Sequence, residues 1–205
     1  PNGKSALVNL LSGTRNGGSF SPEGRNYAPR RNLISKPTHR SSLMKTAHAY
    51  GDNIDTDRII AGKYTKTLDM QSLADHVLED LDPTFRERFV VGDVLVGGDN
   101  FGCGSSREQA PMALKVAGVS VVISRYFARI FFRNAINIGL PVLEIPDHTI
   151  QTGDHLTVDM ASGTVVNETQ QTTYSATHMP GIMLDILAEG GLVPYLKKHG
   201  DYVAI

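Results

Sequence analysis

Short apolar runs alternate with helical patterns through the middle of this chain. Three runs are short and almost wholly apolar, which is typical of strands buried on both faces: 93–97, 119–124 and 140–145. Two stretches between them have apolar residues at helical spacing: 108–117 and 126–138. Strands and helices that alternate this tightly predict parallel neighbouring strands joined by crossover helices. We therefore expect an α/β fold with a mostly parallel central sheet and flanking helices.

Further elements are expected on either side of this centre. A strand is predicted at 44–50. A helix is expected over 72–81, because apolar residues fall at helical spacing there: Leu73, Val77, Leu78 and Leu81. Alternation with a period of two predicts a hairpin within 155–174. Two helices are expected after it, at 181–189 and 192–199.

Residues 1–43 differ in character from the rest of the chain. They are rich in Gly, Ser, Asn, Arg and Pro, and no apolar periodicity continues beyond one turn. Such a segment cannot bury enough surface to offset its ordering entropy. We expect an unstructured leader over 1–43 and one domain over 44–205. The leader has two possible origins, an extension from a cloning vector or an organellar targeting segment rich in Arg and Ser.

The net charge of −1 hides an asymmetry between these two parts. The leader holds seven Lys or Arg and one acid, so 44–205 holds 13 basic and 20 acidic residues. An acidic domain lacks the basic surface that nucleic-acid binding requires, and it needs local cations to bind an anionic substrate. No run of 18 apolar residues occurs, so we expect no membrane span. The expected location is the cytoplasm, or an organellar stroma or matrix if the leader is a targeting segment.

Cys103 is the only cysteine of the chain. This excludes an intramolecular disulfide and a self-contained zinc or iron–sulfur site, which need several thiolates or thiolates with histidines. The seven histidines are scattered. We therefore expect no metal ligand in this chain. For Cys103 itself, packing in a tight loop is favoured over a role as a nucleophile, because no histidine is next to it in sequence.

The stretch 97–108 is a glycine-rich loop that leads into a helix. Its four glycines allow the backbone to approach a ligand closely. Pro111, which is tolerated only in a first turn, indicates that the helix begins just before it. The loop thus brings Ser105, Ser106 and Arg107 to a helix N-terminus, where free amides and the helix dipole favour a carboxylate or phosphate. On these residues alone, a merely capped helix remains the alternative.

Three stretches carry a resemblance to a known family. Residues 51–60 read Gly-Asp-Asn-Ile-Asp-Thr-Asp-Arg-Ile-Ile, residues 100–108 read Asn-Phe-Gly-Cys-Gly-Ser-Ser-Arg-Glu, and residues 128–134 read Ala-Arg-Ile-Phe-Phe-Arg-Asn. These motifs resemble those of the small subunits of isopropylmalate isomerases and their homoaconitase relatives, within the aconitase superfamily. The resemblance extends over roughly residues 47–203 and leaves only the leader outside.

The resemblance implies a swivelling β/β/α domain that closes over a large partner subunit. That partner holds a [4Fe–4S] cluster whose open iron binds the substrate, so this chain has no cofactor of its own. The implied hydro-lyase isomerises 2-isopropylmalate and 3-isopropylmalate, both small dicarboxylates, by dehydration and rehydration in leucine biosynthesis. Homoaconitate and other malate derivatives stay open as substrates. A non-catalytic anion-binding module is the alternative of a different class.

The resemblance also implies a role for each polar residue of the loop. Ser105 would be an alkoxide base that removes the proton next to a carboxylate. Ser106 would donate to substrate oxygens, and Arg107 would bind a carboxylate through two nitrogens. An unperturbed hydroxyl is far too weak an acid for this task near neutral pH. Ser105 therefore needs Arg107, the helix amides and a dry, closed site to stabilise its alkoxide.

Two further residues are candidates for the site. Asp57 matches the aspartate of the family's Thr-Asp signature and would orient active-site groups, although an Asx-turn or a helix cap is the alternative. Lys66 lies in the stretch 64–67, which the resemblance implies reads the variable part of the substrate. It is either a cation that binds a carboxylate or a solvated loop lysine, and the sequence leaves both open.

Four other charged residues are expected to act structurally. Asp52 and Asp55 are interpreted as capping residues in a polar loop. Arg129 and Arg133 are four positions apart on one expected helix, where an ion pair is favoured over contact with substrate.

Overall fold

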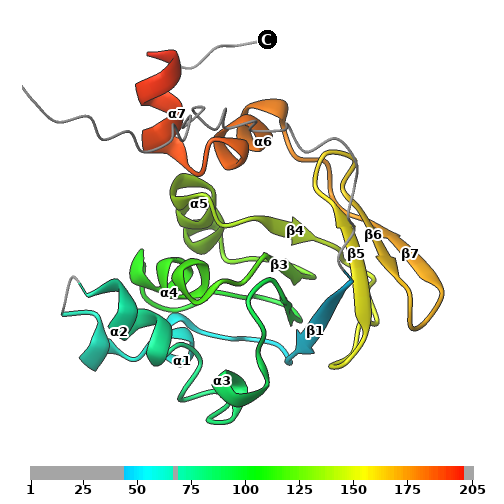
Figure 1. Ribbon diagram of the computed structural model, residues 1–205, viewed down its shortest axis with the longest axis horizontal. Helices are drawn as coiled ribbons and strands as arrows, with labels where there is room; N and C mark the ends of the chain where they lie inside the picture. The colour runs from blue at the N-terminus through cyan, green and yellow to red at the C-terminus, as the bar shows by residue number, and fades with distance from the viewer. Residues whose placement is uncertain (1–43, 67–68, 201–205) are drawn as a thin grey trace, which may run out of the picture. The chain divides into compact units, whose positions relative to one another are not determined.

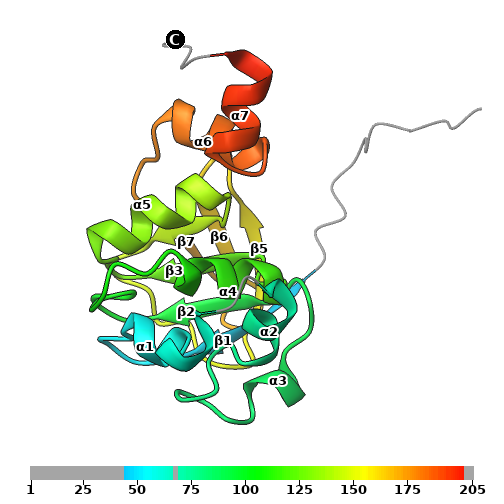
Figure 2. The ribbon, with the colours of Figure 1, turned by 90° about the vertical axis from the view of Figure 1, so that its left-hand side faces the viewer.

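The computed structural model describes residues 44–66 and 69–200 (Figures 1 and 2). The expected leader, 1–43, lies outside the described residues, as do the last five residues of the expected domain. The division between leader and domain therefore stays a prediction. Within the described part of the chain, no helix has both the length and the apolar character that a membrane span requires.

Seven strands of the described ranges form one sheet in the order β4-β3-β2-β1-β5-β6-β7. Their bounds are β1 Lys45–Ala49, β2 Val94–Gly97, β3 Val121–Ser124, β4 Val142–Glu144, β5 His155–Asp159, β6 Thr164–Asn167 and β7 Thr172–Ser175. Strands β1 to β4 pair in parallel, and β1 pairs with β5 in the antiparallel direction. Strands β5, β6 and β7 continue as antiparallel neighbours. The predicted parallel centre and the hairpin within 155–174 are confirmed.

Seven α-helices and one 3₁₀ turn accompany the sheet in the described residues. Their bounds are α1 Thr56–Ile59, η1 Gly62–Tyr64, α2 Met70–Asp75, α3 Phe85–Arg88, α4 Gln109–Ala117, α5 Arg129–Ile138, α6 Gly181–Ala188 and α7 Leu192–His199. Helix α4 connects β2 to β3 and α5 connects β3 to β4, which confirms the predicted crossovers. Both end at a glycine in the left-handed conformation, Gly118 and Gly139. The two predicted C-terminal helices are confirmed as α6 and α7.

Strands β2 and β3 are buried on both faces, as their apolar runs predict. On one face, alternate residues such as Leu95 and Val122 pack into a core shared with α4 and α5. On the other face, Val94 and Val121 join a second core that includes Leu156 of β5. The sheet therefore curls, and its antiparallel half covers the face that the helices leave open (Figure 1).

The predicted helix over 72–81 is too long, because α2 ends at Asp75. Leu78 has a left-handed backbone with φ of 59°, and its amide donates to the carbonyl of Ile59 at 2.8 Å. Val77 and Leu78 are fully buried all the same. The apolar stripe thus marks burial correctly, but a turn buries these side chains where a helix was expected.

Helix α5 begins at Arg129, later than the predicted start at residue 126. The preceding residues pair with the loop after β2 instead, through an isolated bridge between Phe101 and Phe127. Phe101 donates its amide to the carbonyl of Tyr126 at 3.0 Å, and Ala128 donates to the carbonyl of Phe101 at 2.9 Å. The loops that follow β2 and β3 are thereby joined at the carboxyl end of the parallel strands.

Candidate functional site

The glycine-rich loop, 97–108, lies against the polar loop that precedes α1. An isolated bridge pairs Asp55 with Cys103. Three backbone hydrogen bonds join the two loops: Asn53 to Asp99 at 2.8 Å, Gly102 to Ile54 at 2.7 Å, and Thr56 to Cys103 at 2.9 Å. Two of the three motifs that carry the family resemblance are therefore neighbours in space.

Side chains fasten the same two loops. The carboxylate of Asp52 accepts the amide of Asp99 at 2.7 Å, and a β-carbon at Gly98 would overlap that carboxylate. The side chain of Asn100 donates to that of Asn53 at 2.9 Å. Asp52 thus braces the loop and caps no helix, contrary to the expectation. Asp55 caps α1 as expected, because it accepts the amide of Arg58 at 2.8 Å.

An aromatic cluster fixes the other side of the loop to α5. Gly102 has φ of 78°, and a β-carbon there would overlap the ring of Phe131. Phe101 packs edge-on against Phe131, with ring centres 5.2 Å apart, and it also contacts Phe127. The backbone of the loop is thus set by contacts on both sides before any ligand binds.

Ser105 has a firmly held backbone and an exposed side chain. Its carbonyl accepts from the hydroxyl of Thr56 at 3.0 Å and from the amide of Arg107 at 2.8 Å. Thr56 is itself 2% exposed. Ser106 is also exposed. Both serine hydroxyls therefore face outward from a fixed turn.

Helix α4 begins at Gln109, and Arg107 and Glu108 separate it from these serines. No side chain caps its N-terminus, and Pro111 in the first turn has no amide hydrogen to donate. The amide of Ala110 donates to the carbonyl of Arg107 at 3.3 Å. The turn of Ser105 and Ser106 therefore leads to the positive end of the helix dipole, with few first-turn amides left for a ligand.

Arg107 and Asp57 form an ion pair across the two loops. Nη1 of Arg107 donates to Oδ1 of Asp57. The arginine side chain is 24% exposed and the aspartate side chain 57% exposed. The guanidinium also lies beside Gly62 at the start of η1, since a β-carbon there would be 3.6 Å from Nη2. Asp57 is thus in contact with the predicted anion-binding arginine, whereas the cap of α1 is Asp55.

Lys66 is exposed, and no hydrogen bond or ion pair joins its side chain to another described residue. Two residues before it, Tyr64 stacks on His76 with ring centres 3.8 Å apart. The hydroxyl of Tyr64 donates to the carboxylate of Glu79 at 3.0 Å. The turn that carries Lys66 is therefore anchored through Tyr64, and the role of Lys66 stays a prediction.

Cys103 has the environment of a packed thiol. Burial, and next the negative charge of Asp55, raise the pKa of the Cys103 thiol. A raised pKa lowers the thiolate fraction that a nucleophile needs. Across the described residues, no group of three or more His, Cys, Asp or Glu side chains is placed to hold a metal ion.

Two residues that the sequence analysis did not select hold the base of the loop. The hydroxyl of Ser124 lies 2.5 Å from the carbonyl of Gly98 and is fully buried. Nε2 of His148 donates to the carbonyl of Gly97 at 3.0 Å, and burial lowers the pKa of this histidine. For Ser124, the only sequence signal of a role at the site is a hydroxyl at the end of an apolar strand. For His148, the sequence gives no such signal.

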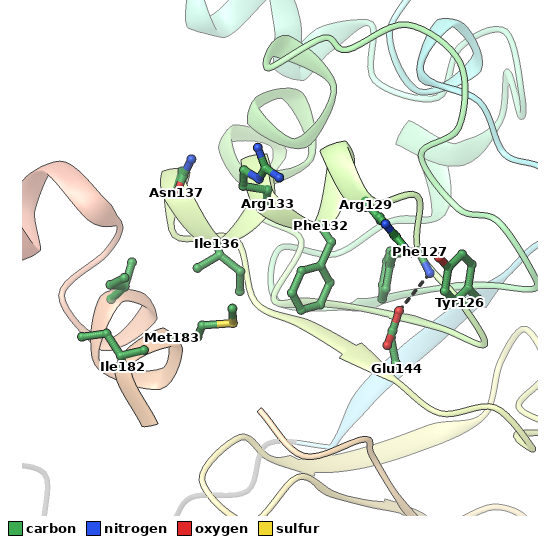
Figure 3. Close-up of a pocket in the computed structure, with 11 residues that line it drawn as sticks. Tyr126, Phe127, Arg129, Phe132, Arg133, Ile136, Asn137, Glu144, Ile182 and Met183 are labelled. Carbon is green, nitrogen blue, oxygen red and sulfur yellow. Dashed lines mark hydrogen bonds between the residues drawn. The ribbon is translucent and has the colours of Figure 1, made fainter. Parts of the chain in front are cut away.

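Arg129 and Arg133 are exposed on α5. Neither forms an ion pair with another residue in the described part of the chain, so the expected structural pairing is not found there. Both side chains line a groove between α5 and α6 (Figure 3).

Comparisons with known proteins identify relatives of this chain. Residues 88–148 match the family model described as the aconitase C-terminal domain. The 3-isopropylmalate dehydratase small subunit 2 of Archaeoglobus fulgidus is 54% identical over 160 residues, which cover 78% of this chain and 97% of that protein. The 3-isopropylmalate dehydratase small subunit of Wolinella succinogenes is 54% identical over 149 residues, covering 72% and 89%.

A solved structure has the same fold. The crystal structure of a 3-isopropylmalate dehydratase from Methanocaldococcus jannaschii superimposes with a TM-score of 0.73 at 44% sequence identity. The match covers 77% of this chain and 95% of that one. The predicted α/β fold class is confirmed by this likeness.

Proposed function

The chain belongs to the family of 3-isopropylmalate dehydratase small subunits, and we propose that it acts as one, together with a large subunit. The proposed reaction isomerises 2-isopropylmalate and 3-isopropylmalate by dehydration and rehydration. One observation carries the proposal: Asp57 holds Arg107 beside two outward-facing serines at the uncapped N-terminus of α4. This combination suits a carboxylate substrate.

Arg107 is proposed to bind one carboxylate of the substrate. A guanidinium has five donors in a rigid, planar arrangement, and only Nη1 of Arg107 is used by Asp57. The contact with Asp57 orients the group, and donors other than Nη1 are proposed to bind a carboxylate through two nitrogens. Ser106 is proposed to donate to the same substrate from the adjacent turn.

Ser105 is proposed to remove the proton next to the carboxylate. Its hydroxyl becomes a base only if the alkoxide is strongly stabilised. The dipole of α4 and the Arg107 guanidinium supply positive potential at this point. The serine is exposed in the isolated chain, so exclusion of water requires a second surface that closes over it.

We assign that second surface to the large subunit. The described residues offer no ligand set for an iron–sulfur cluster, and Cys103 is the only cysteine of the chain. A [4Fe–4S] cluster does not fit this chain and is proposed to be held by the large subunit. The part of this chain is to position Ser105, Ser106 and Arg107.

The proposed substrate is isopropylmalate, because the stretch 64–67 offers at most one cation to bind a third carboxylate. Lys66 is the only candidate cation for a third carboxylate in the stretch 64–67, where Tyr64 and Thr65 precede it. A homoaconitate-type substrate has that third carboxylate, whereas isopropylmalate has an apolar group in its place. We infer that Lys66 points away from the bound isopropyl group.

The proposal is tested by assembling the enzyme. This chain and the large subunit from the same source would be co-expressed, reconstituted with iron and sulfide without oxygen, and assayed on a panel of malate derivatives. We expect isopropylmalate to be turned over with the highest kcat/KM. A complex that forms, contains its cluster and turns over none of the panel would overturn the proposal.

A further inference from the structure

Helix α6 is apolar in almost every direction and yet only partly covered. It contains one charged residue, Asp185. Of its large apolar side chains, only Ile186 is buried. The others are partly exposed: Ile182, Met183, Leu184 and Leu187. A helix that is apolar all round is normally buried on all sides, so α6 lacks a covering layer in the isolated chain.

A groove of about 690 Å³ runs between α5 and α6 (Figure 3). Its lining is mostly apolar and includes Phe132 and Ile136 of α5 and Ile182 and Met183 of α6. Apolar surface on both helices thus combines into one patch of the kind that marks a protein interface.

Two arginines border the groove without a charged partner. Arg129 and Arg133 line it from α5, and neither pairs with a carboxylate among the residues that the structure describes. Glu144 also lines the groove, and its carboxylate accepts the amide of Phe127 at 3.2 Å (Figure 3). Arginine next to apolar and aromatic surface is typical of binding sites for another protein.

The groove is connected to the glycine-rich loop through the backbone. Tyr126 and Phe127 line one end of it. The carbonyl of Tyr126 accepts the amide of Phe101, which belongs to the glycine-rich loop. A partner seated in the groove would therefore contact residues that bond to the loop that carries Ser105 and Arg107. A large subunit must contact this edge of the chain if its cluster is to reach Ser105.

We propose that the groove between α5 and α6 is the docking surface for the large subunit. The predicted occupant is an apolar segment of that subunit, flanked by carboxylates that pair with Arg129 and Arg133. This inference rests on the proposed function, which supplies the partner. The shared edge with the glycine-rich loop favours the large subunit over a second copy of this chain.

The test measures binding separately from turnover. The dissociation constant for the purified large subunit would be determined by biolayer interferometry for the full chain and its variants. We expect Met183→Asp, and separately the double variant Arg129→Glu with Arg133→Glu, to raise Kd by roughly tenfold or more. Val91→Asp is the matched control, because Val91 is an apolar side chain that is 76% exposed elsewhere. Circular dichroism would verify that each variant is folded, and the exposed arginines provide a test if Met183→Asp fails to fold.

Ser105→Ala separates this inference from the proposed function, because it should bind the large subunit normally without turnover. Normal affinity in both groove variants overturns the docking surface even if the enzyme is active. Normal docking with a wild-type complex that turns over no substrate overturns the proposed function alone. If the wild-type chain binds no large subunit, or if the groove variants weaken only self-association, the docking surface is also overturned.

Discussion

Arg107 donates to Asp57 across 50 positions of sequence, and this contact joins the two loops that the family motifs occupy. The pair lies between the turn of Ser105 and the start of η1, where it fixes the direction of the guanidinium. Both side chains of the pair are partly exposed to solvent. Its importance should therefore appear in substrate binding and much less in the stability of the fold.

Replacing Asp57 by Ala should lower kcat/KM of the assembled enzyme by about tenfold, because Arg107 loses the contact that orients it. Asp57→Asn keeps an oxygen acceptor and should recover part of that loss. The free energy of unfolding should change by less than about 1 kcal/mol, as expected for an exposed ion pair. Steady-state kinetics and thermal unfolding measure the two effects. A large loss of stability with unchanged kinetics would show that the pair is structural.

Ser105→Ala should lower kcat by about a hundred- to ten-thousandfold, the range that general-base groups contribute. Substrate affinity should change little, since the methyl group leaves Arg107 and the α4 amides in place. Ser162→Ala, in the exposed turn between β5 and β6, is the control. Single-turnover kinetics and equilibrium substrate binding separate the two quantities. A kcat near that of the wild type would remove Ser105 from the role of base.

Lys66→Leu should leave kcat/KM for isopropylmalate within about threefold of the wild type, or raise it, because an isopropyl group prefers an apolar neighbour. A third carboxylate that meets the ammonium would make the same change cost about ten- to a hundredfold on homoaconitate-type substrates. Both substrates would be assayed on one enzyme preparation. Equal, large losses on both would mean that Lys66 holds the turn together and does not select the substrate.

His148 should make the stability of the chain depend on pH below the ordinary histidine pKa. Burial lowers its pKa in the folded state from a starting value of 6.5. The unfolded chain therefore binds more protons in the window just below 6.5, so stability rises with pH there and falls on acidification. His148→Gln should flatten this part of the profile. Thermal unfolding of the wild type and of the variant would be measured at pH values just below 6.5. If the stability of both proteins changes with pH in the same way, His148 is not the group responsible.

Lys115 should contribute to stability by joining three helices. Its ammonium donates to the carbonyl of Gly190 at 2.9 Å and also to that of Ile138 at the end of α5. Lys115→Met keeps the aliphatic stem but leaves these carbonyls without their donor, which should cost about 1–3 kcal/mol. Chemical denaturation measures the loss. Lys197→Met, an exposed lysine on α7, is the control, and equal stability of both variants would exclude the role.

Local patterns in the sequence predict the central layer of this fold well. The apolar runs at β2, β3 and β4 are buried on both faces, which is a property of each strand by itself. The same patterns fail at Leu78, because a left-handed residue interrupts an apolar stripe without changing its spacing. The amide of Leu78 donates to the carbonyl of Ile59 and does not continue the hydrogen-bond pattern of a helix. Periodicity reports burial more directly than it reports backbone conformation.

The site was predictable only in part. Ser105, Ser106 and Arg107 are adjacent in sequence, so the loop and the helix start indicate them together. Thr56 supports Ser105 from 49 positions away, and no local pattern marks such a contact. Ser124 and His148 likewise act on the loop across the fold. Residues that position a site through tertiary contacts are found only when the chain is seen folded.

Tyr64 stacks on His76, so the turn that carries Lys66 is held by other contacts than the turn that carries Ser105. The turn with Lys66 is fastened to the segment after α2, whereas the serine turn is fastened to Thr56 and to the loops after β2 and β3. The guanidinium of Arg107 lies beside Gly62, at the start of the segment that carries Lys66, so changes at Lys66 should spare the proposed carboxylate-binding group as long as Gly62 and Tyr64 keep their places. With the role proposed for Lys66, a change of substrate would need changes in this one short segment, while the groups proposed for the chemistry would stay as they are.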